Sequence, residues 1–310
     1  MISIVLVVAA AVVVALARAR TRAQARETVR QRLTLDTNGI VVGATTIDLP
    51  TDGDRAVLML HGFGDTPQTL EYLAAYVHAQ GWAVRAPLLP GHGRTLDEFA
   101  ASRATEWLSF ARAELDALRA RYDTIAIVGL SMGGSLATIL ASESKDVRAI
   151  ALLAPYLSMP TRLRRAAALH HVLGIAVPFL RGGGGRSIRD PAEVERNRAY
   201  GYTTPRLVFE LSRIVARGRA AAPLVTVPTL VVQSRQDNRI PPEAAERAFA
   251  LFTTPERRLI WTEGNGHIIT VDYGRQTIFA AVVEWLATHV ARDVRALADI
   301  APSTERPRAV

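Results

Sequence analysis

A serine lies at the centre of the segment 129–133, which reads Gly-Leu-Ser-Met-Gly. The segment directly follows the apolar run 125–130 and opens a stretch with helical periodicity. A sharp turn from strand to helix would expose the hydroxyl of Ser131 and hold it in a strained backbone. The motif in this context predicts a nucleophilic serine, and acyl transfer is the chemistry that such a serine would serve.

A histidine is placed to take the proton of this serine. His267 closes the segment 263–267, a tight turn between the last predicted strand, 258–261, and the last predicted helix, 276–290. In a parallel sheet this turn lies at the carboxyl edge, where Ser131 is also expected. A serine hydroxyl is a weak nucleophile without a neighbouring base, and His267 is predicted to be that base.

An acid is needed to orient the imidazole, and Asp237 has the best placement. It follows the predicted strand 229–232 and therefore belongs to the same edge of the sheet. The chain order serine, aspartate, histidine is the one expected for this architecture. Glu243 and Glu263 are the two nearby carboxylates that could take its place.

Two backbone amides are predicted to stabilise the negative charge that develops on a carbonyl oxygen. The segment 60–64 reads Leu-His-Gly-Phe-Gly and follows a short buried strand, and the N–H of Phe63 is one expected donor. The N–H of Met132, directly after the serine, is the other. His61 and His92 lie in glycine-rich turns and are interpreted as residues that brace loops.

The rest of the chain must hold these residues at one edge. Its pattern alternates short apolar runs with helical stretches, which predicts an α/β fold with a mostly parallel sheet covered by helices on both faces. A leading strand or a hairpin is predicted at 40–49, and strands are predicted at 56–60, 82–88, 125–130, 147–153, 229–232 and 258–261. Helices are predicted at 69–80, 105–122, 132–142 and 276–290.

Residues 155–225, which we call the cap segment, interrupt this alternation. They show little strand signal and are predicted to form a helical cap over the carboxyl edge of the sheet. Six arginines stand among aliphatic residues between 155 and 189, without a single acid. This mixture suits a lid over an acyl pocket at an anionic lipid surface, or an ordinary packed cap with a solvated basic face.

The N-terminal residues 2–17 are uncharged and almost wholly apolar, and six arginines against one glutamate follow in 18–32. A helix of this length rises about 24 Å, which approaches the roughly 30 Å of a hydrocarbon core. We therefore expect a membrane anchor at 1–17 in a single-pass protein of the cell membrane. By the positive-inside rule the rest of the chain would be cytoplasmic. A signal peptide cleaved after 15–17, Ala-Leu-Ala, and a helix on the lipid surface are the alternatives.

The composition excludes several classes of protein. A chain of 310 residues with 49% hydrophobic and 21% charged residues is not disordered and can bury a large core. It contains no cysteine, so disulfides, thiolate catalysis and cysteine-ligated zinc are excluded. The net charge of +8 is concentrated in 18–32 and in the cap segment. The body carries no basic, aromatic-interleaved motif, so nucleic acid is not an expected partner.

Together these residues resemble the α/β-hydrolase superfamily. Within it they are similar to the bacterial carboxylesterase and monoacylglycerol lipase group, which shares features with the serine aminopeptidase-like hydrolases. The similarity covers about residues 55–290 in the family's order, and many members lack the apolar N-terminal segment. It is carried by the stretches 60–64, 87–93, 129–134, 236–242 and 266–272.

The resemblance implies an α/β-hydrolase fold and a serine carboxylic ester hydrolase that forms an acyl-enzyme. Ser131, His267 and Asp237 would be the catalytic residues, with the amides of Phe63 and Met132 as the oxyanion hole. No metal or cofactor would be needed. The expected substrate is a small-molecule or lipid ester, such as a monoacylglycerol.

Two other hypotheses about the function of the same fold stay open. One is a peptidase or C–C bond hydrolase; a proline-specific aminopeptidase would need cap carboxylates, for which Glu193, Glu195 and Glu210 are available. The other is a non-catalytic, membrane-tethered protein of the hydrolase fold. The expected layout is an anchor at 1–17, a basic connector at 18–38, a core at 39–154 and 226–300, a cap at 155–225 and a disordered tail at 301–310.

Overall fold

The computed structural model describes residues 2–182 and 187–300. In this part of the chain seven strands form one sheet in the order β1-β3-β2-β4-β5-β8-β9. Neighbouring strands are parallel except for β1 and β3, which are antiparallel. The strands are β1 (Ile47–Leu49), β2 (Arg55–Leu60), β3 (Ala83–Ala86), β4 (Thr124–Leu130), β5 (Val147–Leu153), β8 (Thr229–Ser234) and β9 (Arg257–Thr262).

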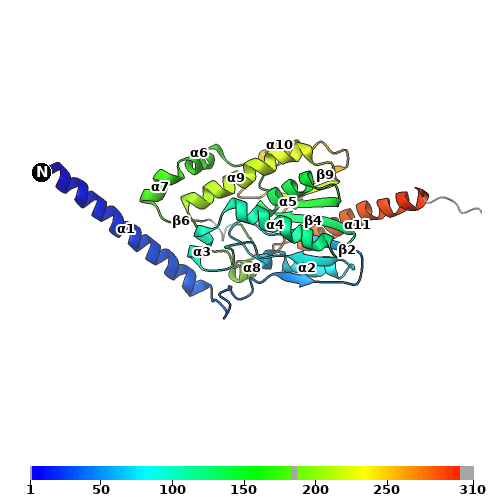
Figure 1. Cartoon of the computed structure of the whole chain (residues 1–310), viewed down its shortest axis with the longest axis horizontal. Helices are drawn as coiled ribbons and strands as arrows, with labels where there is room; N and C mark the ends of the chain where they lie inside the picture. Colours follow the sequence, from blue (N-terminus) through cyan, green and yellow to red (C-terminus); the bar gives the residue numbers. More distant parts are fainter. Residues whose placement is uncertain (1, 183–186, 301–310) are drawn as a thin grey trace, which may run out of the picture.

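Helices cover both faces of this sheet (Figure 1). Helices α4 and α5 pack on one face, where α9 covers α5, and α2 and α11 pack on the other face. The helices are α1 (Ile2–Arg32), α2 (Glu71–His78), α3 (Leu96–Ala101), α4 (Ala104–Arg119), α5 (Met132–Glu143), α6 (Thr161–Ala168), α7 (His170–Ala176), α8 (Pro191–Arg196), α9 (Pro205–Ala221), α10 (Pro242–Phe249) and α11 (Arg275–Ile300).

The side chains of β2 illustrate why the central strands are mostly apolar. Ala56, Leu58 and Leu60 point into the core below α4 and α5. Val57 and Met59 point into the core below α2 and α11, and all five are wholly buried. A strand covered on both faces favours apolar side chains at successive positions. The prediction of a mostly parallel sheet between two helical layers is confirmed.

The cap segment connects β5 to β8, which are neighbours in the sheet. It contains α6, α7, α8 and α9, and α9 packs against α5 while α6 and α7 pack on α9. A two-stranded antiparallel sheet, β6 (Leu180–Arg181) with β7 (Tyr202–Thr203), was not predicted, because each strand has only two residues. The helical character of this segment agrees with the sequence, while its limits as a domain stay a prediction.

The expected membrane anchor is wrong. No helix in residues 2–182 and 187–300 is long and apolar enough to cross a membrane. Helix α1 is continuous from Ile2 to Arg32, but its uncharged stretch ends at Ala17, short of the about 20 apolar residues that a span needs. The single-pass location at the cell membrane, and the cytoplasmic placement derived from it, lose their basis.

The second half of α1 packs on the folded body. Ala25 and Val29 lie on one side of the helix, and Leu33 follows its last residue with the same spacing of four. All three are buried in the core that contains α4 and α5. Arg26 on the same half pairs with Asp97 of α3 at 2.9 Å. In Figure 1 the first half of α1 extends away from the body. The tail predicted at 301–310 lies outside the described residues.

Candidate active site

Ser131 occupies the turn between the end of β4 and the start of α5. Its φ of 54° lies in the left-handed region that residues with a side chain rarely adopt. The backbone is held on both sides, because the N–H of Ser131 donates to the carbonyl of Leu153 and its carbonyl accepts from the N–H of Tyr156. These bonds keep the strained turn in place at the carboxyl end of a central strand.

Steric contact explains the two glycines of the motif. A Cβ at Gly133 would lie 1.9 Å from the carbonyl oxygen of Leu60. A Cβ at Gly129 would lie 2.3 Å from the carbonyl oxygen of Gly133. Both distances are far shorter than any van der Waals contact, so the turn requires a residue without a side chain at both positions.

The structure brings Ser131, His267 and Asp237 into one hydrogen-bonded chain. The Oγ of Ser131 lies 2.8 Å from Nε2 of His267. Nδ1 of the same ring lies 2.7 Å from Oδ2 of Asp237. A carboxylate can only accept, so in the neutral ring Nδ1–H donates to Asp237 and Nε2 is left to accept the serine proton. All three residues are less than 10% exposed, at 8%, 7% and 8% respectively.

The carboxylate of Asp237 is held as an anion by its surroundings. Its Oδ1 accepts from the N–H groups of Arg239 and Ile240 at 2.7 and 2.9 Å, and Oδ2 also accepts from the amide of Gln233 at 2.7 Å. Burial by itself raises the pKa of Asp237, but the charge of His267, its hydrogen bond and the two backbone donors together hold that pKa below its ordinary value. Asp237 therefore stays charged beside the imidazole.

The two substitute carboxylates do not take this position. The side chain of Glu263 is 73% exposed and faces Arg235 at 3.7 Å. Glu243 is an exposed residue in the first turn of α10. Asp237 is the carboxylate that contacts the imidazole.

The two expected oxyanion donors belong to segments next to Ser131. Phe63 belongs to the loop after β2 and lines the same cavity as the serine. In this loop a Cβ at Gly62 would lie 3.4 Å from the Cβ of Ser131, so the backbone passes close to the nucleophile. Met132 begins α5, and the N–H groups in the first turn of a helix have no partner within the helix.

His61 and His92 lie behind this loop and contact one another. His61 is fully buried; its Nδ1–H donates to the carbonyl of Gly62 and its Nε2 accepts the N–H of Leu89. Burial lowers the pKa of His61 to about 4, so the ring is neutral. Burial also lowers the pKa of His92 well below its usual range, and the two rings lie edge to face with centroids 5.1 Å apart. These contacts agree with the interpretation that both histidines brace loops.

A cavity of about 430 Å³ opens above Ser131 and His267. Its size is within the range of small-molecule sites. The wall above the two residues is mainly aliphatic and aromatic, which suits an apolar ligand. The cap segment contributes Leu163, Leu180, Tyr200, Tyr202, Val208 and Leu211.

Sequence reasoning missed two charged residues in this cavity, Asp65 and Arg239. Asp65 is 7% exposed, and burial raises its pKa to about 6 against the opposing charges of His267 and Arg239. The sequence offered one signal for Asp65, because it lies in the loop after β2 and this loop was already expected beside Ser131. Within the described residues no group of His, Asp and Glu side chains could hold a metal ion.

A serine on a strained turn after a central parallel strand is the hallmark of the α/β-hydrolases, and the sheet and its helices place this chain among them. The chain belongs to the serine aminopeptidase S33 family, whose model matches residues 51–273.

Two bacterial relatives narrow the class. The chain is 27% identical over 238 residues to the thermostable monoacylglycerol lipase of Bacillus sp. strain H-257, which covers 77% of this chain and 92% of the lipase. It is also 27% identical over 237 residues to the carboxylesterase of Bacillus subtilis strain 168, covering 76% and 93% respectively. These similarities identify the chain as an ester hydrolase of the lipase and esterase type.

Solved structures agree with this assignment. A structure reported for LipS and LipT, two metagenome-derived lipolytic enzymes, matches with a TM-score of 0.74 at 29% identity, covering 80% of this chain and 98% of that one. The monoacylglycerol lipase of Paleococcus ferrophilus matches with a TM-score of 0.68 at 22% identity, covering 79% and 98%. At that lower identity the second likeness concerns the fold alone.

Proposed function

We propose that this chain is a serine carboxylic ester hydrolase of the carboxylesterase or monoacylglycerol lipase type. The observation that carries the proposal is the hydrogen-bonded chain from Ser131 through His267 to Asp237 at the floor of a largely apolar cavity. The named activities of the two bacterial relatives support an ester as the substrate.

In the first step the Oγ of Ser131 bonds to the carbonyl carbon of the ester while Nε2 of His267 takes the serine proton. Asp237 keeps the Nδ1–H in place and stabilises the imidazolium. The carbonyl oxygen becomes an anion, and the N–H groups of Phe63 and Met132 donate to it. The bond to the alcohol then breaks, and the alcohol leaves with the proton from Nε2.

In the second step a water molecule replaces the alcohol. His267 takes a proton from the water, and the water oxygen attacks the carbonyl carbon of the acyl-enzyme. The bond to Ser131 breaks, the serine recovers its proton from Nε2, and the carboxylic acid is released. Both steps use the same base and the same oxyanion donors.

The cavity favours an acyl ester with an apolar chain. Leu163, Val208 and Leu211 of the cap segment line it above the nucleophile, where an acyl chain would lie. Asp65 and Arg239 provide a polar side close to His267, which suits the hydroxyl groups of an alcohol such as glycerol. We therefore propose lipid-derived esters, including monoacylglycerols, as substrates.

The aminopeptidase alternative receives less support from the cap carboxylates. Glu193 accepts from the hydroxyl of Tyr72 at 2.8 Å and pairs with Arg196. Glu210 accepts the N–H of Ala104 at 3.1 Å. Neither residue lines the cavity, and Glu195 is exposed on α8, so none of the three is placed to hold the amine of a substrate.

Hydrolysis of p-nitrophenyl esters from acetate to dodecanoate, of a 1-monoacylglycerol and of a prolyl p-nitroanilide tests the proposal. We expect ester and monoacylglycerol hydrolysis, and a loss of at least about 10³-fold in kcat/KM for Ser131→Ala. A fluorophosphonate probe should label the wild type and Ser109→Ala, an exposed serine of α4, but not Ser131→Ala. Cleavage of the anilide alone, or full activity of Ser131→Ala, would overturn the proposal.

A further inference from the structure

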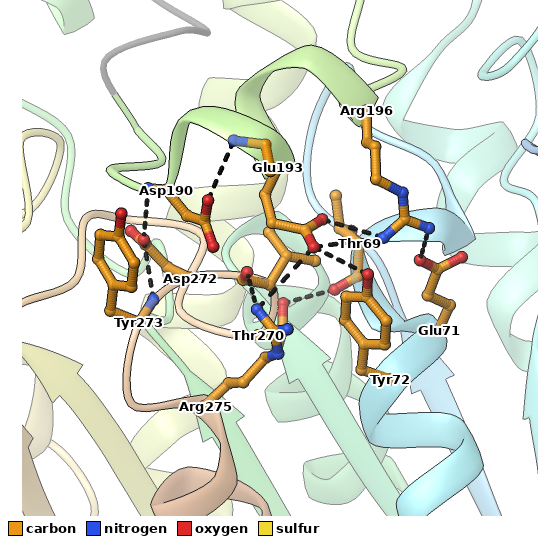
Figure 2. A network of polar contacts seen from close by, with 12 residues as sticks. Thr69, Glu71, Tyr72, Asp190, Glu193, Arg196, Thr270, Asp272, Tyr273 and Arg275 are labelled. Carbon is orange, nitrogen blue, oxygen red and sulfur yellow. Dashed lines mark hydrogen bonds and ion pairs between the residues drawn. The ribbon is translucent and has the colours of Figure 1, made fainter.

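Asp272 is a wholly buried carboxylate five positions after His267, in the loop between β9 and α11 (Figure 2). Both of its oxygens accept hydrogen bonds from backbone amides. Oδ2 accepts from Gly266 at 2.7 Å and Arg189 at 2.9 Å, and Oδ1 accepts from Asp190 at 3.0 Å and Tyr273 at 2.9 Å. A charged group that accepts four backbone N–H bonds is a strong and geometrically specific anchor.

These bonds join two segments that are far apart in the sequence. Gly266 directly precedes His267, whereas Arg189 and Asp190 belong to the cap segment. One carboxylate therefore fixes the position of the cap segment relative to the histidine loop.

The other side of His267 is tied to the same part of the cap segment. The N–H of Ile268 donates to the carbonyl of Ser187 at 2.9 Å. A Cβ at Gly266 would lie 2.5 Å from that carbonyl oxygen, so the two backbones are in direct contact. The residues before and after His267 are thus both held by contacts that involve residues 187–190.

From these contacts on both sides of His267 we infer that Asp272 is a positioning residue for His267. It couples the cap segment to the geometry of the imidazole. The inference rests on the proposed role of His267 as the base. Nε2 must meet Oγ of Ser131 at hydrogen-bond distance, and a displacement of about 1 Å in such a site costs about 100-fold in rate. Through Asp272 the placement of residues 187–190 sets the placement of the base.

A neighbouring network anchors α8 without Asp272. Glu193, whose side chain is 6% exposed, accepts from Tyr72 of α2 at 2.8 Å and pairs with Arg196 at 3.3 Å (Figure 2). Arg196 also pairs with Glu71 at 2.5 Å. Because these contacts remain when Asp272 is changed, α8 should stay docked on α2 while the histidine loop loses its anchor.

The test is Asp272→Asn, in which an amide nitrogen replaces one accepting oxygen and faces two backbone N–H groups. The matched control is Asp36→Asn, since Asp36 also accepts two backbone N–H bonds, from Asn38 and Ile40, in a turn that does not line the cavity. With a p-nitrophenyl ester we expect kcat to fall about 100-fold for Asp272→Asn, while KM changes less than about 3-fold. We expect no selective fall in kcat for Asp36→Asn.

A spectroscopic measurement separates positioning from general loss of structure. The proton on Nδ1 of His267 should give a downfield NMR signal in the wild type, which shifts or disappears in Asp272→Asn while the far-ultraviolet circular dichroism is retained. Unchanged kcat and an unchanged His267 signal would overturn the inference. If Ser131→Ala abolishes activity and Asp272→Asn does not change it, the proposed function stands and only this inference fails.

A second variant covers the case in which Asp272→Asn does not fold. Gly266→Ala presses a methyl group against the carbonyl of Ser187. It disturbs the same contact between the histidine loop and the cap segment while Asp272 stays intact. We expect the same fall in kcat and the same change in the His267 signal. Wild-type values of both in Gly266→Ala would also contradict the coupling.

Discussion

Nε2 of His267 lies 2.8 Å from Oγ of Ser131, although 136 residues separate them in the chain. The two residues meet because each follows a strand of the same sheet, β9 and β4, and parallel strands end at one edge. Asp237 follows β8, which lies between them in the strand order. The arrangement of the candidate site is therefore a consequence of sheet topology.

Replacement of Asp237 by Asn is expected to lower kcat by about 10³-fold or more while the fold is retained. The amide can donate to Nδ1 instead of accepting from it, which places the ring proton on Nε2, where the serine proton must go. Steady-state kinetics and circular dichroism measure the two parts of this prediction. Glu263→Gln is the control, because this exposed side chain faces Arg235. Equal losses in both variants would show that Asp237 has no special role.

Asp65→Asn is expected to stabilise the protein at neutral and alkaline pH. Burial raises the pKa of Asp65 from 3.8 to about 6, so between these values the folded state binds more protons than the unfolded state and stability falls as pH rises. Removing the charge should raise the free energy of unfolding by up to about 3 kcal/mol above pH 6.

The pH dependence of this gain is what the measurement must show. Urea unfolding of wild type and Asp65→Asn between pH 4 and pH 8 should give a difference that grows with pH and levels off above the pKa of about 6. Asp52→Asn, at an exposed position before β2, should give a small difference without this trend. A difference for Asp65→Asn that does not depend on pH contradicts the prediction.

Leu163→Trp is expected to shift the enzyme towards short acyl chains. Leu163 of α6 lines the cavity, and a larger ring would occupy space needed by a long chain. We expect the ratio of kcat/KM for dodecanoate to that for acetate to fall about 10-fold, which corresponds to about 1.4 kcal/mol in transition-state binding. Leu224→Trp, at a position 65% exposed, should leave the ratio unchanged. The p-nitrophenyl ester series measures both.

Leu33→Ala is expected to destabilise the protein by about 2 to 4 kcal/mol, because it removes a buried side chain that packs with the second half of α1 against the body. Leu35→Ala is the control at a position 40% exposed, and should cost less than about 1 kcal/mol. Denaturant unfolding gives both values. Similar small losses would mean that α1 contributes little to the stability of the body.

The local part of the site could be predicted from the sequence. The residue types of segment 129–133 follow from local geometry. The serine lies on a strained turn after a strand, and close backbone contacts on both sides of it require glycine. The alternation of apolar runs and helical stretches predicted the parallel sheet, and its topology places Ser131, Asp237 and His267 at one edge. Their roles in catalysis remain the proposal that the mutants test.

Other features were decided by tertiary structure alone. The apolar segment before Arg18 led to the prediction of a membrane anchor, whereas Ala25 and Val29 of the same helix are buried in the core. Whether an amphipathic or apolar helix meets lipid, solvent or protein depends on what packs beside it, and periodicity does not contain that information.

The burial of Asp65 and Asp272 could not be predicted from the sequence for the same reason. Each is an ordinary aspartate in a loop, and each becomes distinctive through burial: one beside His267 in the cavity, the other beneath four backbone amides from two distant segments. The sequence by itself determined the sheet, the serine turn and the residues at its edge, because these follow from local pattern and strand order. The tertiary structure decided which charges are buried and what they hold, because burial is set by contacts between distant residues.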